Sequence, residues 1–300
     1  MQKLAKSELK GFLFAGIAAI ALANSFIFSK LSFAELDFFQ FGFWWFLLGT
    51  AWNLIYLLIF RRYQLAWSNF YKLLTGPLLI VTVLEAVATA LFYYAILKMT
   101  NLGVVSFIGN IGPVFVSIMG FIVLKESFNR LQLTGIIIAI GGIFILNYQA
   151  YTKISDILIP GSQYVILASF LFAVAAIIAR RHFKIIDAGI LSLVRALLML
   201  MGFLILIITF SHFSSFSLKT LGYVSIGSFL EVFITIIFAY MSFKYIKAFK
   251  TSITISTKGI FALISAWIFL GLKPELRELI GGLLSIVGVV LVSKETKKDV

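Results

Sequence analysis

The sequence predicts an all-α membrane protein with ten transmembrane helices arranged as two inverted five-helix repeats. The first observation is composition: 61% of the 300 residues are hydrophobic and 12% are charged, whereas a soluble domain has about 25% charged residues. The second is a series of ten apolar stretches, and the third is a segment that occurs twice. Together they exclude a soluble fold with a single membrane anchor.

Each of the ten stretches is expected to form one membrane-spanning helix. Most approach or exceed the length of about 20 residues that crosses about 30 Å of hydrocarbon. The connections between them are short and leave no room for a soluble domain between helices. In chain order the stretches are 11–29, 38–60, 74–97, 102–124, 131–149, 162–180, 190–210, 221–243, 249–270 and 277–293.

The repeated segment recurs at an offset of 146 residues. The matched pairs are Glu85 and Glu231, Thr89 and Thr235, Phe92 and Phe238, Tyr94 and Tyr240, and Lys98 and Lys244. Five spans per half is an odd number, so two homologous halves in series must cross the membrane in opposite orientations. The predicted repeats cover residues 11–149 and 162–293, and a connection over 149–162 joins them.

The net charge of +13 is explained by the predicted topology. With a cytoplasmic N-terminus, 17 lysines and arginines fall in cytoplasmic segments and 6 in the opposite loops, while Arg195 and Lys258 lie inside spans. This bias follows the positive-inside rule and places both termini in the cytoplasm. We therefore expect a multi-pass integral protein of a bacterial inner or plasma membrane, with no nucleic-acid partner.

The sequence carries no signature of a catalytic or metal centre. It has no cysteine, which excludes disulfides, thiolate ligands and cysteine nucleophiles. It also contains no nucleophile-elbow, zinc-protease or phosphate-loop motif. We expect no cofactor, no metal site and no enzymatic activity.

Glu85 and Glu231, near the centres of spans three and eight, are the first candidates for function. A carboxylate at that depth costs on the order of 3 kcal/mol. One threonine and one phenylalanine share the helical face of each glutamate, at i+4 and i+7; they are Thr89, Phe92, Thr235 and Phe238. Such a face suits ammonium binding or proton coupling, or else a structural hydrogen bond to a neighbouring helix. The duplication favours a functional role.

Two basic residues inside spans are further candidates. Lys258 lies near the centre of span nine, where it needs a partner or water. It either pairs with Glu231 or Glu85 as a lock that substrate releases, binds a substrate carboxylate, or forms a permanent structural ion pair. Arg195, in the cytoplasmic third of span seven, either binds an anionic group or extends to the membrane interface.

Several uncharged residues complete the candidate set. Asn24 and Asn110, in spans one and four, are either cavity contacts or interhelical hydrogen-bonding groups. For the tryptophans, contact with lipid is favoured over a place in the cavity wall; these are Trp44, Trp45, Trp52 and Trp267.

Glycine and proline mark two places where a helix is expected to bend or unwind. These are residues 109–113 in span four and 256–259 in span nine; an ordinary kink is the alternative. A second group of glycines is predicted to allow close helix packing; it comprises Gly135, Gly141, Gly142, Gly281, Gly282 and Gly288.

Short segments of both halves resemble the EamA-type proteins of the drug/metabolite transporter superfamily. They are Tyr94–Thr100, Pro113–Phe115, Leu124–Asn129 and Gly135, and then Tyr240–Tyr245, Gly259, Leu270–Gly271 and Gly281. The resemblance covers about residues 11–293 and implies ten helices, inverted halves, a central substrate cavity and alternating access. Family members typically move amino acids, other small metabolites, sugar derivatives or drugs, often outward.

Three functional hypotheses follow. The first is a secondary transporter of a small metabolite, such as an amino acid or a related zwitterionic or amine compound, by alternating access around a midplane cavity. The second is a proton-coupled exporter of lipophilic cations or drugs, and the third is a membrane enzyme or lipid-handling protein. The expected partners are a small-molecule substrate and the lipid bilayer, with the proton as candidate coupling ion and a homodimer as candidate assembly.

Overall fold

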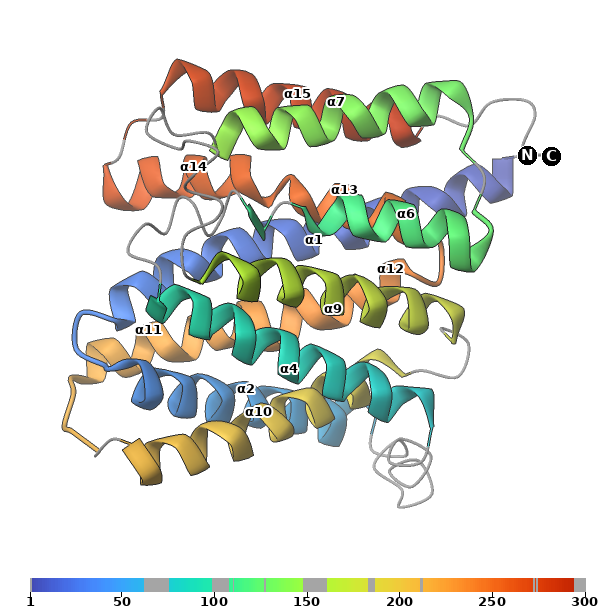
Figure 1. The fold of residues 1–300 in the computed structure, drawn as a ribbon. Coiled ribbons are helices and arrows are strands. Elements are labelled where there is room, and N and C mark those ends of the chain that lie inside the picture. The colour runs from blue at the N-terminus through green and yellow to red at the C-terminus, as the bar shows by residue number, and fades with distance from the viewer. Residues whose placement is uncertain are drawn as a thin grey trace.

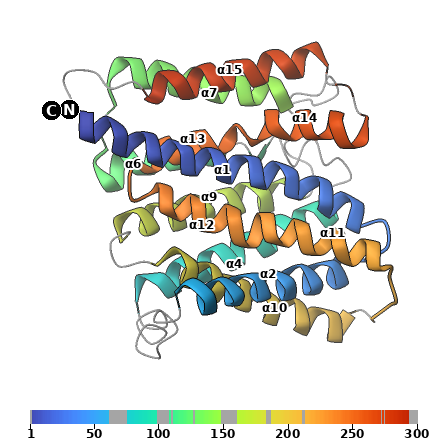
Figure 2. The ribbon, with the colours of Figure 1, turned by 180° about the vertical axis from the view of Figure 1, so that it is seen from behind.

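A computed structural model gives the architecture of the chain. It describes residues 2–61, 76–98, 108–109, 111–126, 128–147, 161–182, 187–210, 213–271, 273 and 275–293. The described part is a bundle of long helices that run roughly parallel or antiparallel to one another (Figure 1). Helix α1 begins and helix α15 ends at the same end of this bundle (Figures 1 and 2), as an even number of spans requires.

The helices follow the predicted apolar stretches closely. The first repeat contains α1 (Gln2–Ser32), α2 (Phe38–Phe60), α4 (Pro77–Lys98), α6 (Gly112–Leu124) and α7 (Arg130–Asn147). The second contains α9 (Ser162–Arg181), α10 (Ala188–Phe210), α11 (Leu218–Ser228), the π-helix η2 (Phe229–Thr235), α12 (Ile236–Ser242), α13 (Ala248–Ser256), α14 (Lys258–Leu270) and α15 (Leu276–Ser293). Five spans of the described chain are long and apolar enough by themselves to cross a membrane: 7–32, 38–60, 162–181, 188–210 and 218–242.

The packing pattern shows two inverted five-helix repeats. Helix α4 of the first repeat packs against α9 and α10 of the second. Reciprocally, the continuous span α11–η2–α12 packs against α1 and α2. The second spans of the two repeats pair (α2 with α10), as do the fifth spans (α7 with α15). The fold is therefore the predicted all-α membrane fold of ten transmembrane helices.

Equivalent aspartates begin the second span of each repeat. Asp37 Oδ1 accepts hydrogen bonds from the backbone amides of Phe39 and Gln40 at 2.8 and 2.9 Å. Asp187 Oδ1 accepts from the amides two and three residues onward at 2.9 and 3.2 Å. A carboxylate that accepts from free amides favours the start of a helix. Counted from these caps, Trp45 of α2 and Arg195 of α10 occupy the same position.

Glycines bring α7 and α15 into backbone contact at one edge of the bundle. A Cβ atom on Gly142 would lie 2.4 Å from the Ser285 amide nitrogen, and one on Gly288 would lie 2.4 Å from the Ala139 amide nitrogen. Close helix packing is thus found as predicted at these positions. It is not found at Gly141, where an added Cβ would have no atom of the described residues within 4 Å.

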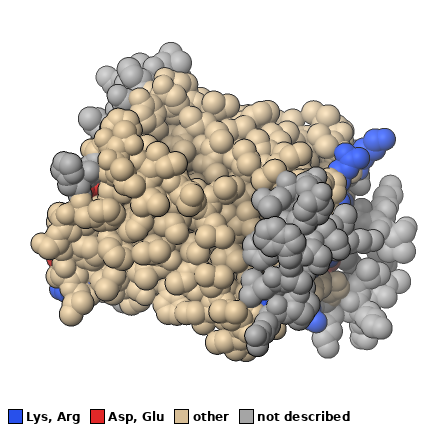
Figure 3. Space-filling view, turned by 90° about the horizontal axis from the view of Figure 1, so that it is seen from below, with Lys and Arg blue, Asp and Glu red and all other residues tan. Residues whose placement is uncertain are grey.

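Two spans of the second repeat are irregular at their centres. Span nine is interrupted at Thr257, between α13 and α14, inside the segment expected to unwind. Span eight changes to a π-helix around Glu231. The outer face in Figure 3 is almost free of charged residues, and the lysines and arginines visible there lie at the two ends of the bundle. An uncharged middle band is the surface that a lipid environment requires.

Candidate functional site

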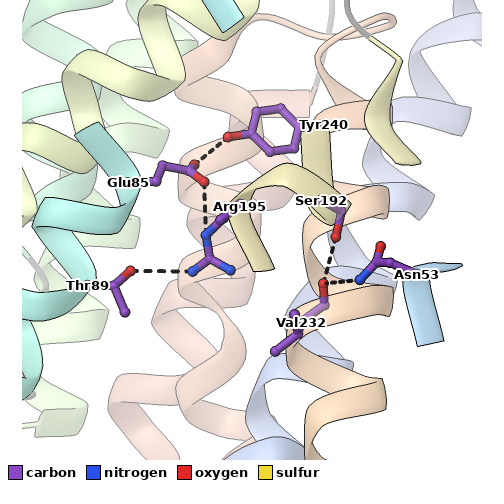
Figure 4. Close-up of polar contacts among 7 residues, drawn as sticks. All are labelled: Asn53, Glu85, Thr89, Ser192, Arg195, Val232 and Tyr240. Atoms are coloured by element: carbon purple, nitrogen blue, oxygen red, sulfur yellow. Dashed lines mark hydrogen bonds and ion pairs between the residues drawn. The ribbon is translucent and has the colours of Figure 1, made fainter. Parts of the chain in front are cut away.

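A buried ion pair joins the two repeats near the middle of the bundle. Arg195 Nε on α10 lies 3.1 Å from Glu85 Oε2 on α4, and the two side chains are 5% and 14% exposed. The Tyr240 hydroxyl, from α12, donates a hydrogen bond to Glu85 Oε1 (Figure 4). Arg195 Nη2 lies 3.4 Å from the Thr89 hydroxyl oxygen, one turn beyond Glu85. Three spans from both repeats therefore surround one carboxylate.

The guanidinium of Arg195 is incompletely used by these contacts. Its Nε approaches Glu85 closely but outside hydrogen-bond geometry, and its Nη1 has no hydrogen-bond partner among the described residues. An unpaired buried donor costs about 1–3 kcal/mol, and more when it is charged. Arg195 can therefore accept an additional oxygen ligand in this interior site.

The π-helix brings a backbone carbonyl into a second polar cluster. The Ser192 hydroxyl donates to the Val232 carbonyl oxygen at 2.7 Å, and Asn53 Nδ2 lies 3.4 Å from the same oxygen (Figure 4). Single-turn π segments within α-helices occur frequently at functional sites. Here the segment holds Glu231 beside α2 and α10, close to the first polar cluster.

Glu231 has a different environment from Glu85. It interacts electrostatically with Arg195 and with Lys258, but it forms no ion pair with any lysine or arginine that the structure describes. Its neutral neighbour is the indole of Trp45. The buried Nε1 of Trp45 makes no hydrogen bond of ordinary geometry with any residue that the structure describes, so this contact is looser than a hydrogen bond.

Lys258 lies at the helix interruption, as the first residue of α14. Its Nζ lies 5.8 Å from the centroid of the Phe26 ring on α1, and its electrostatic partner is Glu231. Of the two glutamates offered by the sequence, the structure thus couples this lysine to the one in its own repeat.

Two further predicted site residues form hydrogen bonds with uncharged groups. Asn24 accepts a hydrogen bond from Ser265 Oγ at 2.9 Å and donates to the Ile20 carbonyl, which is the interhelical alternative. Thr235 is buried and donates to the Leu230 carbonyl at 2.9 Å within the π-helix.

The aromatic candidates occupy separate places. Phe238 contacts the edge of Phe14, with ring centroids 5.5 Å apart, and Phe92 is partly buried beside Gly109. Asn110 lies outside the described residues. These positions leave Glu85, Glu231, Arg195, Lys258 and Thr89 as the central group of predicted residues.

Two residues of the site were not assigned to it from the sequence. Tyr240 was visible as the repeat partner of Tyr94, but its contact with Glu85 depends on the crossing of two repeats. For Trp45, contact with lipid was favoured over a place in the cavity wall, and that preference is wrong because its side chain is 0% exposed. The shared position of Trp45 and Arg195 after the two capping aspartates is the signal that could have found it.

A third buried carboxylate links spans four and nine at the end of the bundle where α1 begins. Glu126 Oε1 accepts a hydrogen bond from the Ala248 amide, the first residue of α13, at 3.1 Å. Burial raises the pKa of Glu126, while the Ala248 hydrogen bond and the charge of Arg180 oppose that shift. Arg180 itself donates to the Phe243 carbonyl. Glu126 therefore fixes the start of α13 relative to the end of α6.

Two substitutions of Glu126 are expected to distinguish the contribution of its hydrogen bond to stability from the contribution of its charge. Glu126→Ala leaves the Ala248 amide unpaired and should lower the free energy of unfolding by about 1–3 kcal/mol. A carboxyl with a raised folded-state pKa contributes most to stability at low pH, and this contribution is lost as the pH rises through that pKa. Glu126→Gln keeps the acceptor without the charge, so at neutral pH it should be at least as stable as the wild type. Thermal unfolding in detergent checks both variants, and a glutamine variant as unstable as the alanine variant would contradict the assignment.

Comparison with known proteins places the chain in a family. Residues 9–148 and 159–294 each match the EamA-like transporter family. The chain belongs to this family. As two EamA repeats fill most of its length, it is a multi-pass integral membrane transporter, in agreement with the resemblance noted in the sequence.

Similar proteins support the same architecture. An uncharacterized transporter of Synechocystis sp. is 27% identical over 216 residues, which are 69% of this chain and 62% of that protein. An uncharacterized transporter of Archaeoglobus fulgidus is 28% identical over 292 residues, covering 94% of this chain and 96% of that protein. A solved structure, titled only as the crystal structure of a protein, has a TM-score of 0.78 at 13% identity. It covers 95% of this chain and 96% of its own and shows the fold alone.

Proposed function

We propose that this EamA-family protein is a secondary transporter of a small zwitterionic metabolite, such as an amino acid or a related amine compound. The observation that carries the proposal is the central set of charges. It combines two carboxylates, Glu85 and Glu231, with two cationic side chains, Arg195 and Lys258. The formal charge of the set is zero, which matches a substrate that brings one charge of each sign.

The unpaired part of Arg195 supplies the selectivity for a carboxylate. Its Nη1 is buried and has no hydrogen-bond partner in the part of the chain that the structure describes, and a guanidinium binds carboxylates with strong, charge-assisted hydrogen bonds. Glu231 would then bind the ammonium of the substrate, and this ammonium would replace Lys258 as the cation that interacts with the Glu231 carboxylate. A lipophilic cation fits this set less well, because the two basic side chains would oppose it.

The proposed mechanism is alternating access of the two inverted repeats around the charged set. Residues from both repeats contribute to it: Glu85 and Thr89 come from α4, Arg195 from α10 and Tyr240 from α12. A movement of one repeat against the other therefore changes these contacts. Substrate drives the cycle only if its contacts with the protein differ between the two access states. Side chains contributed by both repeats provide that difference, because they move relative to one another.

The experiment is counterflow in proteoliposomes. Vesicles containing the purified protein would be loaded with a pooled metabolite library and tested for exchange of labelled compounds. Each substrate found would then be compared with its decarboxylated amine and its deaminated acid. We expect the zwitterion to exchange at least about tenfold faster than either analogue, a difference of about 1.4 kcal/mol. Equal transport of the amine, or preference for lipophilic cations, would contradict the proposal.

A further inference from the structure

The two glutamates of the repeated segment face non-equivalent partners at equivalent positions. Arg195 and Trp45 follow the capping aspartates of α10 and α2 by the same number of residues. Arg195 lies 3.1 Å from Glu85 of the first repeat, and α2, which carries Trp45, packs against η2, which carries Glu231 of the second. The inverted symmetry therefore places a permanent cation beside one glutamate and a neutral indole beside the other.

The contacts make Glu85 the more firmly held carboxylate. It has an ion pair with Arg195 and accepts a hydrogen bond from Tyr240. Adding a proton to Glu85 would weaken the ion pair and leave Arg195 as an uncompensated buried charge, which is strongly unfavourable. The partners of Glu85 thus oppose its protonation.

Glu231 has no comparable set of partners. The charged groups that face it are Arg195 from α10, which is already paired with Glu85, and Lys258 from α14. Helix α2 presents the Trp45 indole, and α1 contributes no charged residue between positions 11 and 29. The adjoining segment α12 likewise contains no charged residue. A proton can neutralise Glu231 without breaking an ion pair of the described structure.

We propose that Glu231 is the proton-binding site of the transporter, and that a proton and the substrate ammonium exclude each other there. Glu85 remains ionised with Arg195 throughout the cycle. The inference rests on the proposed function, because it gives Glu231 a cationic substrate group to exchange. When the zwitterion binds, the Glu231 proton leaves to water, so the charged set returns from one positive charge to zero. Proton and substrate then cross in opposite directions.

The first test counts protons released on substrate binding. Isothermal titration in buffers of different ionisation enthalpy, with the zwitterion found by counterflow, should give about one proton per substrate for the wild type below the pH at which Glu231 ionises. Glu231→Gln should release none. Glu85→Gln should bind at least about tenfold more weakly, about 1.4 kcal/mol. It should still release a proton when it is titrated at a pH low enough to offset the freed charge of Arg195 beside Glu231. Release that persists in Glu231→Gln, or that disappears only in Glu85→Gln, overturns the assignment.

A second pair of variants tests the same point with smaller changes to the protein. Trp45→Phe removes the N–H group beside Glu231, and Tyr240→Phe removes the hydroxyl that donates to Glu85. A lost donor favours the protonated carboxyl, so Trp45→Phe should shift the pH midpoint of substrate affinity upward. Tyr240→Phe should leave that midpoint in place. The opposite pattern would assign the proton to Glu85.

The outcomes separate this inference from the proposed function. If the wild type prefers lipophilic cations to zwitterions, the proposed function fails. The proposed exchange of a proton for the ammonium of a zwitterion at Glu231 then fails as well. If zwitterions are preferred but their binding is independent of pH and releases no proton, the proposed function stands and the proton site at Glu231 is wrong.

Discussion

Arg195→Met is expected to abolish transport and to destabilise the protein by about 3–5 kcal/mol, because removal of one partner from a buried ion pair leaves the other uncompensated. The uncompensated group is Glu85, which among the described residues keeps only the hydrogen bond from Tyr240. The same change removes the proposed carboxylate ligand. Thermal unfolding in detergent and counterflow in proteoliposomes measure the two effects separately.

A double variant distinguishes the structural role of Arg195 from its role in binding. Combining Arg195→Met with Glu85→Gln removes both charges and should restore most of the lost stability. Transport should remain absent, because no guanidinium is left for the substrate carboxylate. Recovery of transport together with stability would show that the ion pair only supports the fold.

Gly142→Val should cause the largest loss of stability among changes outside the charged set. A Cβ at this position would lie 2.4 Å from the Ser285 amide nitrogen and 2.6 Å from the Gly281 carbonyl oxygen. Both atoms belong to the backbone of α15, so no side-chain rotation relieves the overlap. Overpacking costs about 1–3 kcal/mol where the surroundings can adjust, and we expect at least the upper part of that range here.

The neighbouring glycine provides the control for this prediction. An added Cβ at Gly141 meets nothing within 4 Å, and alanine has a higher helix propensity than glycine. Gly141→Ala should therefore leave the melting temperature in detergent unchanged or raise it. Equal melting temperatures for Gly142→Val and Gly141→Ala would contradict the packing of α7 against α15.

The fold was predictable because bilayer physics leaves few alternatives. Long apolar stretches must form helices in a membrane, and the recurrence of Glu85 as Glu231 revealed the duplication. Residues 256–259 were correctly expected to interrupt a helix, because three successive polar residues followed by a glycine weaken the helix there. The π-helix around Glu231 has no such local signal and was not predicted.

The site could be predicted only in part. Membrane depth alone identified Glu85, Glu231 and Lys258, since each charge is unfavourable in lipid. The partners of these residues depend on how the two repeats pack against each other, and this packing cannot be derived from the sequence of one helix. Trp45 shows the consequence. Contact with lipid was favoured for this aromatic residue of an apolar stretch, although it is buried where α2 packs against η2.

The most direct test of the account measures the coupling between Arg195 and the substrate carboxylate. Dissociation constants would be determined for the zwitterion and its decarboxylated amine, with the wild type and with the stability-restored double variant at positions 85 and 195. Loss of the carboxylate should weaken binding to the wild type at least about tenfold, which is about 1.4 kcal/mol. In the double variant the two ligands should bind equally. An equal loss of affinity in both proteins would show that Arg195 does not contact the carboxylate and would contradict the proposed site.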